Sequence, residues 1–132
     1  MPNRFAASSG AFTVTDGVVA GFPTLTYITN EGTGHEAIAA YLQETWGQYG
    51  ITVKVETQEW ATFLNTRKNG EYSVARNGWL GDYNDPISFL DMWITSSGNN
   101  DSQFGKGDHA SYAGYAGGKT WAESYDALIA EV

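Results

Sequence analysis

The chain has 132 residues, 42% of them hydrophobic, which is typical of one globular domain rather than of a disordered segment. Fifteen acidic against seven basic residues give a formal net charge of −8, which argues against nucleic acid as a partner. The lack of cysteine excludes disulfides and thiolate metal sites, and no apolar run reaches the length of a membrane span.

The first 23 residues are small, polar and punctuated by glycine, so we expect an irregular arm or a short hairpin there. Met1 to Gly10 contains no apolar stretch of the kind found in secretory signals, and no signal peptide is expected in this chain. We expect residues 24–132 to form a single α/β domain.

Three strands are predicted between Thr24 and Trp93. The first is Leu25–Thr29, the second alternates apolar residues over residues 51–55, and the third is Tyr72–Trp79. A helix is predicted in each interval, and this strand-helix-strand-helix-strand order predicts a parallel sheet with right-handed crossovers.

The first helix is expected from about His35 to Tyr49 and the second after an N-cap at Thr57. Gly50 and Gly70 are the expected left-handed stops of the two helices. The apolar face of the first helix is predicted to consist of Ile38, Leu42 and Trp46, with Ala39 and Tyr49 beside them. That of the second helix is predicted to consist of Trp60, Phe63 and Leu64.

Asp85-Pro86 predicts the start of a further helix, with Asp85 as N-cap and Ile87, Leu90 and Ile94 facing the core. A polar loop (Thr95 to Gln103) and a glycine-rich run (Gly105 to Gly118) follow. Thr120 and Glu123 match a capping box, which predicts a last helix over Trp121–Glu131. The residues expected to point inward in that helix are Tyr125, Leu128 and Ile129.

Arg76 lies within the third predicted strand, where a guanidinium requires an anionic partner. The strand continues into a loop that contains Trp79, Asp82 and Tyr83. Ligands of parallel sheets bind beyond the carboxyl ends of the strands, so we expect this loop and His35 to face one crevice.

Each of these residues also has a structural interpretation. Arg76 would pair with a carboxylate of the chain itself, and Asp82 would be a turn residue. Arg67 would extend from the edge of an apolar helix face, His35 would be a surface residue, and Trp60 and Trp79 would belong to the core. The carboxylates considered for Arg76 are those of Asp82, Glu59 and Asp91.

Motifs of the common enzyme classes are missing from the sequence, which contains two histidines far apart. A small hydrolase that uses Asp82, Asp85 and His35 is the enzyme alternative, although no nucleophile–base motif supports it. We therefore expect a protein that is not an enzyme and that needs neither a metal nor another cofactor.

An ordered set of short motifs points to a family. Together they resemble the oligopeptide-binding receptors of bacterial ABC importers, family 5 of the extracellular solute-binding proteins, over roughly Thr24 to Asn100 and again in the last helix. The motifs are Gln58-Glu59-Trp60, Phe63-Leu64, Thr66-Arg67, Val74-Ala75-Arg76, Gly78-Trp79, Asp82-Tyr83-Asn84, Pro86, Phe89-Leu90 and Tyr125-Asp126-Ala127-Leu128-Ile129.

The resemblance implies a periplasmic-binding-protein-like lobe that is part of a larger, two-lobed receptor. It implies that Asp82 pairs with the α-ammonium of a peptide and that Arg76 and His35 help to receive the terminal carboxylate. Trp60, Trp79, Arg67 and Tyr83 match positions near that site.

The implied partners are short peptides and, through the full receptor, the permease of an ABC importer, in an extracytoplasmic location. A partial lobe is expected to bind peptides weakly, because closure of two lobes supplies most of the burial. The alternatives are a lobe for another solute (a nickel chelate, haem or an oligosaccharide) and an excised structural domain without activity.

Overall fold

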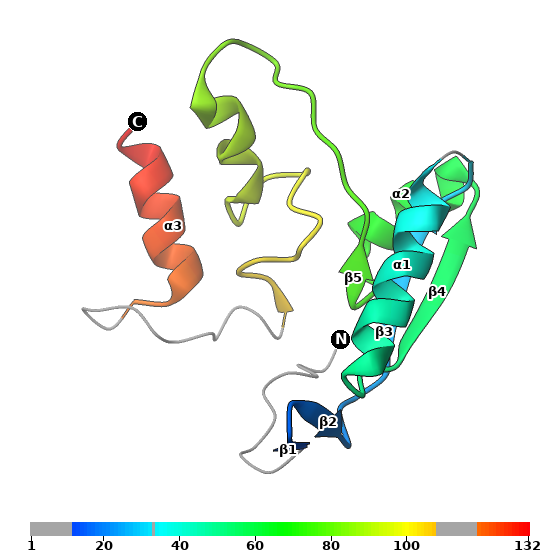
Figure 1. The fold of residues 1–132 in the computed structure, drawn as a ribbon. Coiled ribbons are helices and arrows are strands. Elements are labelled where there is room, and N and C mark those ends of the chain that lie inside the picture. The colour runs from blue at the N-terminus through cyan, green and yellow to red at the C-terminus, as the bar shows by residue number, and fades with distance from the viewer. Residues whose placement is uncertain (1–11, 33, 108–118) are drawn as a thin grey trace. The chain divides into compact units, whose positions relative to one another are not determined.

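The computed structural model describes residues 12–32, 34–107 and 119–132 (Figure 1). The backbone groups into two compact units, which we describe separately. The N-terminal unit comprises the described residues up to Asn77 except Lys68–Gly70, and the C-terminal unit comprises Lys68–Gly70 and Gly78–Val132. The division into an arm and a single domain stays a prediction. In the described residues no helix is long and apolar enough to cross a membrane.

The N-terminal unit begins with an antiparallel hairpin, which was one of the two forms expected for this segment. Strand β1 (Thr13–Thr15) pairs with β2 (Val18–Ala20), and the amide of Val19 donates to the carbonyl of Tyr49 at 2.7 Å. The hairpin is therefore hydrogen-bonded to the segment that follows the first helix.

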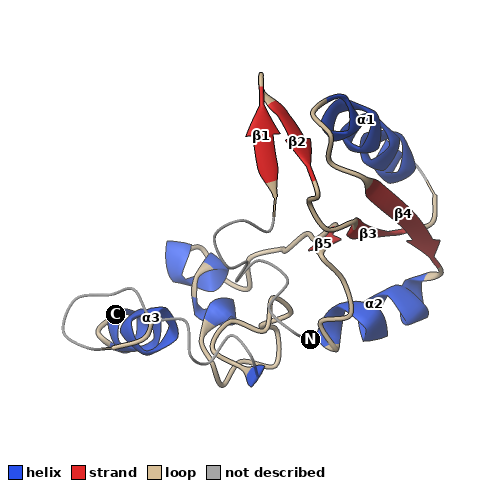
Figure 2. Ribbon diagram, turned by 90° about the horizontal axis from the view of Figure 1, so that it is seen from below, coloured by secondary structure: helices blue, strands red, loops and turns tan. Residues whose placement is uncertain are grey.

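The sheet of this unit has the predicted alternation of strands and helices. The elements are β3 (Leu25–Asn30), α1 (Gly34–Gln48), β4 (Val53–Gln58), α2 (Trp60–Lys68) and β5 (Val74–Ala75). The strands are parallel in the order β4-β3-β5, and Figure 2 shows α1 on one side of the sheet and α2 on the other. The predicted α/β architecture with a parallel sheet is confirmed.

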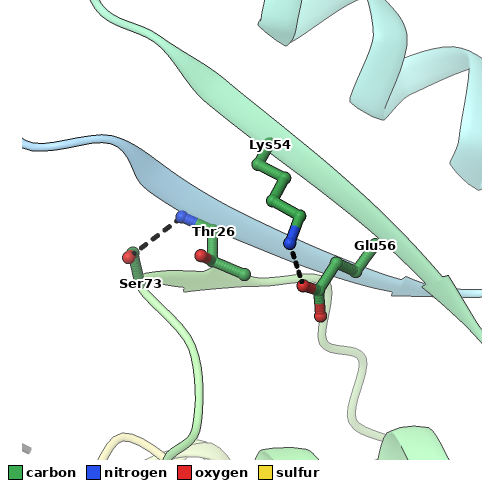
Figure 3. Close-up of polar contacts among 4 residues, drawn as sticks. All are labelled: Thr26, Lys54, Glu56 and Ser73. Carbon is green, nitrogen blue, oxygen red and sulfur yellow. Dashed lines mark hydrogen bonds and ion pairs between the residues drawn. The ribbon is translucent and has the colours of Figure 1, made fainter.

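Strand β5 is much shorter than the predicted Tyr72–Trp79 strand. The amide of Ser73 donates to Thr26 O and the amide of Arg76 donates to Ile28 O, which adds one hydrogen bond on each side of β5. The hydroxyl of Ser73 also accepts from the amide of Thr26 at 3.1 Å (Figure 3). Pairing with β3 ends at Arg76, and β5 is an edge strand of the sheet.

Surface charge on β4 contributes little to the sheet. Lys54 and Glu56 form an ion pair of 3.2 Å on one face of this strand (Figure 3). Their side chains are 67% and 36% exposed, and pairs this exposed stabilise proteins by less than about 1 kcal/mol.

The core of the N-terminal unit lies between the sheet and α1. Leu25, Tyr27 and Val53 are buried there against Ala39, with Leu42 and Trp46 packed beside them. Ile38, predicted to belong to the apolar face, is 55% exposed, so this prediction was wrong. Ala39, Leu42 and Trp46 are three and four residues apart and form the contact stripe instead, because a small residue at position 39 lets the helix approach the sheet.

The predicted glycine stops of the two helices are present, but the predicted N-cap of α2 is not. Gly50 and Gly70 have φ angles of +85° and +68°, which confirms both as left-handed residues after helices. Thr57 is not the N-cap of α2, because it belongs to β4. The carboxylate of Glu59 accepts instead from the amides of Ala61 and Thr62, in the position next to the helix.

The C-terminal unit contains two short 3₁₀-helices where one helix was predicted, η1 (Pro86–Phe89) and η2 (Asp91–Trp93). Asp85 is the N-cap, as expected, and its carboxylate accepts from Ile87 N at 2.9 Å. The predicted core face was wrong, because Ile87 and Ile94 are only partly buried and Leu90 is 44% exposed. Ser88 and Met92 are buried, since the tighter 3₁₀ turn displaces the inward positions.

The last helix, α3 (Trp121–Ala130), has the predicted capping box. Leu128 was expected to point inward but is 54% exposed, whereas Ala122 and Ser124 are buried. Most of the glycine-rich run lies outside the described residues.

Replacing the cap of α3 provides a test of its local stability. Thr120→Ala removes the hydroxyl that accepts from Glu123 N at 3.2 Å, so we expect a loss of about 1 kcal/mol. Thr120→Ser keeps the acceptor and is expected to stay within about 0.5 kcal/mol of the parent chain. Amide hydrogen exchange in α3 measures both, and equal protection in the two variants would contradict the capping role.

Candidate functional site

The loop from Trp79 to Asp85 in the C-terminal unit is held in place by one buried serine. Ser88 is 1% exposed, and its carbonyl accepts the indole N–H of Trp79 at 2.8 Å. Its hydroxyl accepts the backbone N–H of Asp82 at 2.7 Å. The side chains of Asp82 and Tyr83 are exposed, so the backbone is fixed while the functional groups face solvent.

The Tyr83 hydroxyl is influenced by three carboxylates. It donates to Asp91 Oδ2 over a long distance of 3.5 Å. Partial desolvation and then the negative charges of Asp91, Asp85 and Asp82 raise the pKa of Tyr83 above 10.0. This loop is therefore a region of negative potential, which suits a cationic group.

The N-terminal unit presents the carboxyl ends of its parallel strands at one sheet edge. Arg76 lies immediately after β5 and is partly buried, whereas it was expected inside a buried strand. His35 is the second residue of α1, five residues after Asn30 at the end of β3, and it is partly buried. Trp60 opens α2 two residues after the end of β4, with 49% of its surface exposed.

Phe63 joins several of these residues. It is completely buried, its ring centroid lies 5.9 Å from that of Trp60, and the Arg67 guanidinium carbon stands 5.1 Å from its ring centroid. Arg67 Nη1 donates to the carbonyl of Arg76 over 3.5 Å. The structure thus places Trp60 and Arg67 against one buried ring, and a hydrogen bond links Arg67 to the backbone of Arg76.

Of the three carboxylates predicted as possible partners of Arg76, only that of Glu59 lies in the same unit. Glu59 uses its carboxylate on the amides of α2, and the described residues show no ion pair between it and Arg76. Asp82 and Asp91 belong to the other unit, so their pairing with Arg76 stays a prediction. A crevice that includes His35, Trp79 and Asp82 likewise stays a prediction.

Some residues of the site region were not predicted. Ser88 gave no signal, because a serine between Ile87 and Phe89 has the pattern of an ordinary surface position. At the sheet edge, Asn30 Oδ1 and Gln58 Oε1 are buried without a hydrogen-bond partner among the described residues, and these two residues pair in register. The detectable signal was an amide residue at the end of β3 and at the end of β4.

Comparison with known proteins is consistent with this arrangement. The family model described as "Bacterial extracellular solute-binding proteins, family 5 Middle" matches residues 7–101, which is more than half of the chain. The chain belongs to this family. The resemblance inferred from the motifs is thereby confirmed, and the family is one of binding proteins rather than of enzymes.

Two curated relatives and one solved structure illustrate the relationship of this family 5 chain. The periplasmic oligopeptide-binding protein OppA of Salmonella typhimurium is 39% identical over 82 residues, covering 61% of this chain and 15% of that protein. OppA of Haemophilus influenzae is 39% identical over 109 residues, covering 82% and 19%. The solved structure of H. influenzae OppA in complex with RPPGFSPFR has a TM-score of 0.59 and 27% identity, covering 82% of this chain and 22% of that one.

The chain therefore spans less than a fifth of the length of these two curated relatives. The structural similarity confirms the fold expected for a lobe of a periplasmic binding protein.

Proposed function

We propose that this chain is part of the ligand lobe of an oligopeptide-binding receptor that serves ABC-type import. The observation that carries the proposal is the Ser88-anchored loop, which exposes Asp82 in a family of extracellular solute-binding proteins. Three relatives, with 39%, 36% and 39% identity, are named as oligopeptide-binding or murein peptide-binding proteins.

Charged residues of the family motifs would receive the two ends of a peptide. Asp82 would accept charge-assisted hydrogen bonds from the α-ammonium, which are stronger than bonds between neutral groups. Arg76, with His35 nearby on the sheet edge, would donate to the terminal carboxylate. Trp60, Trp79, Arg67 and Tyr83 would contact the peptide beside these groups.

This role requires no catalysis and no cofactor. The receptor would act outside the cytoplasm and deliver its peptide to the permease of an importer. Ligand enclosure would require an opposing lobe, since one lobe alone leaves one side of a peptide in water.

Peptide binding by the chain provides the test. Tri-alanine is expected to bind no more tightly than about 1 mM and to shift the NMR signals of Asp82 and Tyr83. Asp82→Asn or N-acetylation of the peptide is expected to abolish the shift of Tyr83. Glu44→Gln, on the exposed side of α1, is the matched control for the lost charge. Shifts that persist with the acetylated peptide would contradict the role of Asp82, and micromolar affinity would refute the need for a second lobe.

A further inference from the structure

Strand β4 is an edge strand of the sheet in the N-terminal unit. Among the described residues it pairs with β3 alone. It has six residues, whereas β5 at the opposite edge has two. A long edge strand leaves a row of backbone N–H and C=O groups on which another strand can pair. The edge of β4 is therefore the larger of the two places where this sheet can be extended.

The backbone groups of β4 alternate in direction. Between residues 52 and 58 the even-numbered residues face β3, because the amide of Leu25 donates to Thr52 O in this register. The odd-numbered residues face away from the sheet, and accordingly the carbonyl of Val53 accepts the Gln43 side chain at 2.8 Å. The residues whose backbone groups face outward are Val53, Val55 and Thr57.

The side chains of β4 suit pairing with a further strand. The three residues whose backbone faces outward are β-branched, a residue type that is enriched in strands. Lys54 and Glu56, two residues apart, lie on one face of the strand and form an ion pair there (Figure 3). This exposed pair stabilises the single chain little, so both charges can serve a partner that presents the opposite sign at each position.

We propose that the edge of β4 pairs antiparallel with the same edge of a second copy of this chain, about a two-fold axis at Val55. In this register Val55 faces its equivalent, and the two residues exchange both backbone hydrogen bonds. Lys54 stands opposite Glu56 of the second copy, in a non-hydrogen-bonded pair where side chains are closest. The two-fold axis repeats that pair, so the contact contains two complementary pairs of charges. The inference is independent of the proposed function.

The charge pattern of β4 selects this register over its neighbours. A shift of the second copy by two residues in one direction puts Lys54 opposite its own equivalent, and a shift in the other direction does the same for Glu56. Like charges directly opposite each other destabilise a strand pair. Pairing of the β4 edge with the β5 edge of another copy would use a different edge on each copy and repeat without closing, whereas the two-fold contact closes at two copies.

The side of α1 that overlies this edge carries small residues. Gln43 marks that side by its hydrogen bond to Val53 O, and Ala40 and Gly47, three and four residues away, are exposed. A Cβ at Gly47 would meet nothing within 4 Å among the described residues. The carbonyl of Val53 also has a second lone pair beside the bond from Gln43. Helix α1 therefore leaves room for a second strand at the edge.

Sedimentation equilibrium of the 132-residue chain tests the contact. A single strand pair is a small interface, so we expect a reversible dimer with a dissociation constant above about 1 µM. In NMR spectra, the amides of Val55 and Thr57 should become more protected from hydrogen exchange as the concentration rises. A chain that remains monomeric at about 1 mM, or that forms species larger than a dimer, would overturn the inference.

Charge reversal tests the register. Lys54→Glu and Glu56→Lys each place like charges opposite each other at both pairs, so either variant alone is expected to raise the dissociation constant at least about tenfold. The two substitutions change the net charge in opposite directions, so general repulsion between chains would not weaken the dimer in both. An equimolar mixture of the two variants has opposite charges at both pairs and is expected to form a heterodimer with an affinity close to that of the parent dimer. Single variants that dimerise as tightly as the parent chain, or a mixture that stays monomeric, would overturn the inference.

Further variants locate the contact. Lys119→Glu makes the same charge reversal at an exposed residue ahead of α3 and should leave the dissociation constant unchanged. Thr57→Pro removes an outward amide without removing a hydrogen bond to β3, so it is expected to weaken the dimer, with the melting temperature as a check of the fold. If tri-alanine shifts the amide signals of Val55 and Thr57 in a chain that stays monomeric, the edge accepts an extended peptide and the assignment of a second copy is wrong.

Discussion

Phe63→Ala is expected to lower the free energy of unfolding of the N-terminal unit by about 3–5 kcal/mol, because the ring is completely buried and its removal leaves a cavity. The substitution also removes the aromatic ring that contacts both the Arg67 guanidinium and the Trp60 indole. Urea denaturation gives the loss of stability.

Two variants separate packing from the interaction with Arg67. Phe63→Leu retains most of the apolar volume but removes the aromatic face, so we expect a smaller loss together with a shift of the Arg67 side-chain NMR signals. Tyr41→Ala replaces an aromatic residue that is 66% exposed on α1 and is expected to change stability by less than about 0.5 kcal/mol. If Phe63→Ala were as mild as Tyr41→Ala, Phe63 would not be the centre of this cluster.

Gly50→Ala is expected to destabilise the N-terminal unit by about 2–4 kcal/mol, for two independent reasons. The φ angle of +85° is unfavourable for a residue with a Cβ, and that Cβ would lie 2.0 Å from the carbonyl oxygen of Val19. A backbone atom cannot rotate away as a side chain does, so the β1–β2 hairpin would have to move. Thermal denaturation should show a lower melting temperature, and the signals of Val19 should shift.

The chain contains a matched control three residues earlier. Gly47 lies within α1, and a Cβ there would meet nothing within 4 Å. Gly47→Ala is therefore expected to stabilise the helix by about 0.5–1 kcal/mol. The same chemical change should thus have opposite signs at positions 47 and 50, and effects of the same sign would contradict the conformational argument.

The candidate site was only partly predictable from the sequence. Asp82, Trp79 and Tyr83 were recognised by motif and do lie in one loop, but the anchor of that loop is Ser88, which has no distinctive pattern. Arg67 was predicted to lie on the apolar face of its helix, and it does lie against Phe63. Its hydrogen bond to the carbonyl of Arg76 links residues on two elements, which helix periodicity could not indicate.

The sequence by itself determined the order of strands and helices, the parallel sheet, the glycine stops and the capping box of α3. These features depend on local rules: apolar periodicity, left-handed glycine and hydrogen bonds between residues three apart. Only the tertiary structure decided that β5 has two residues, that Ile38 faces outward, that Glu59 rather than Thr57 caps α2, and that Ser88 holds the loop of Asp82. The physical reason is that each of these outcomes depends on which distant backbone or side chain competes for the same space or hydrogen bond, and no pattern along the chain records that competition.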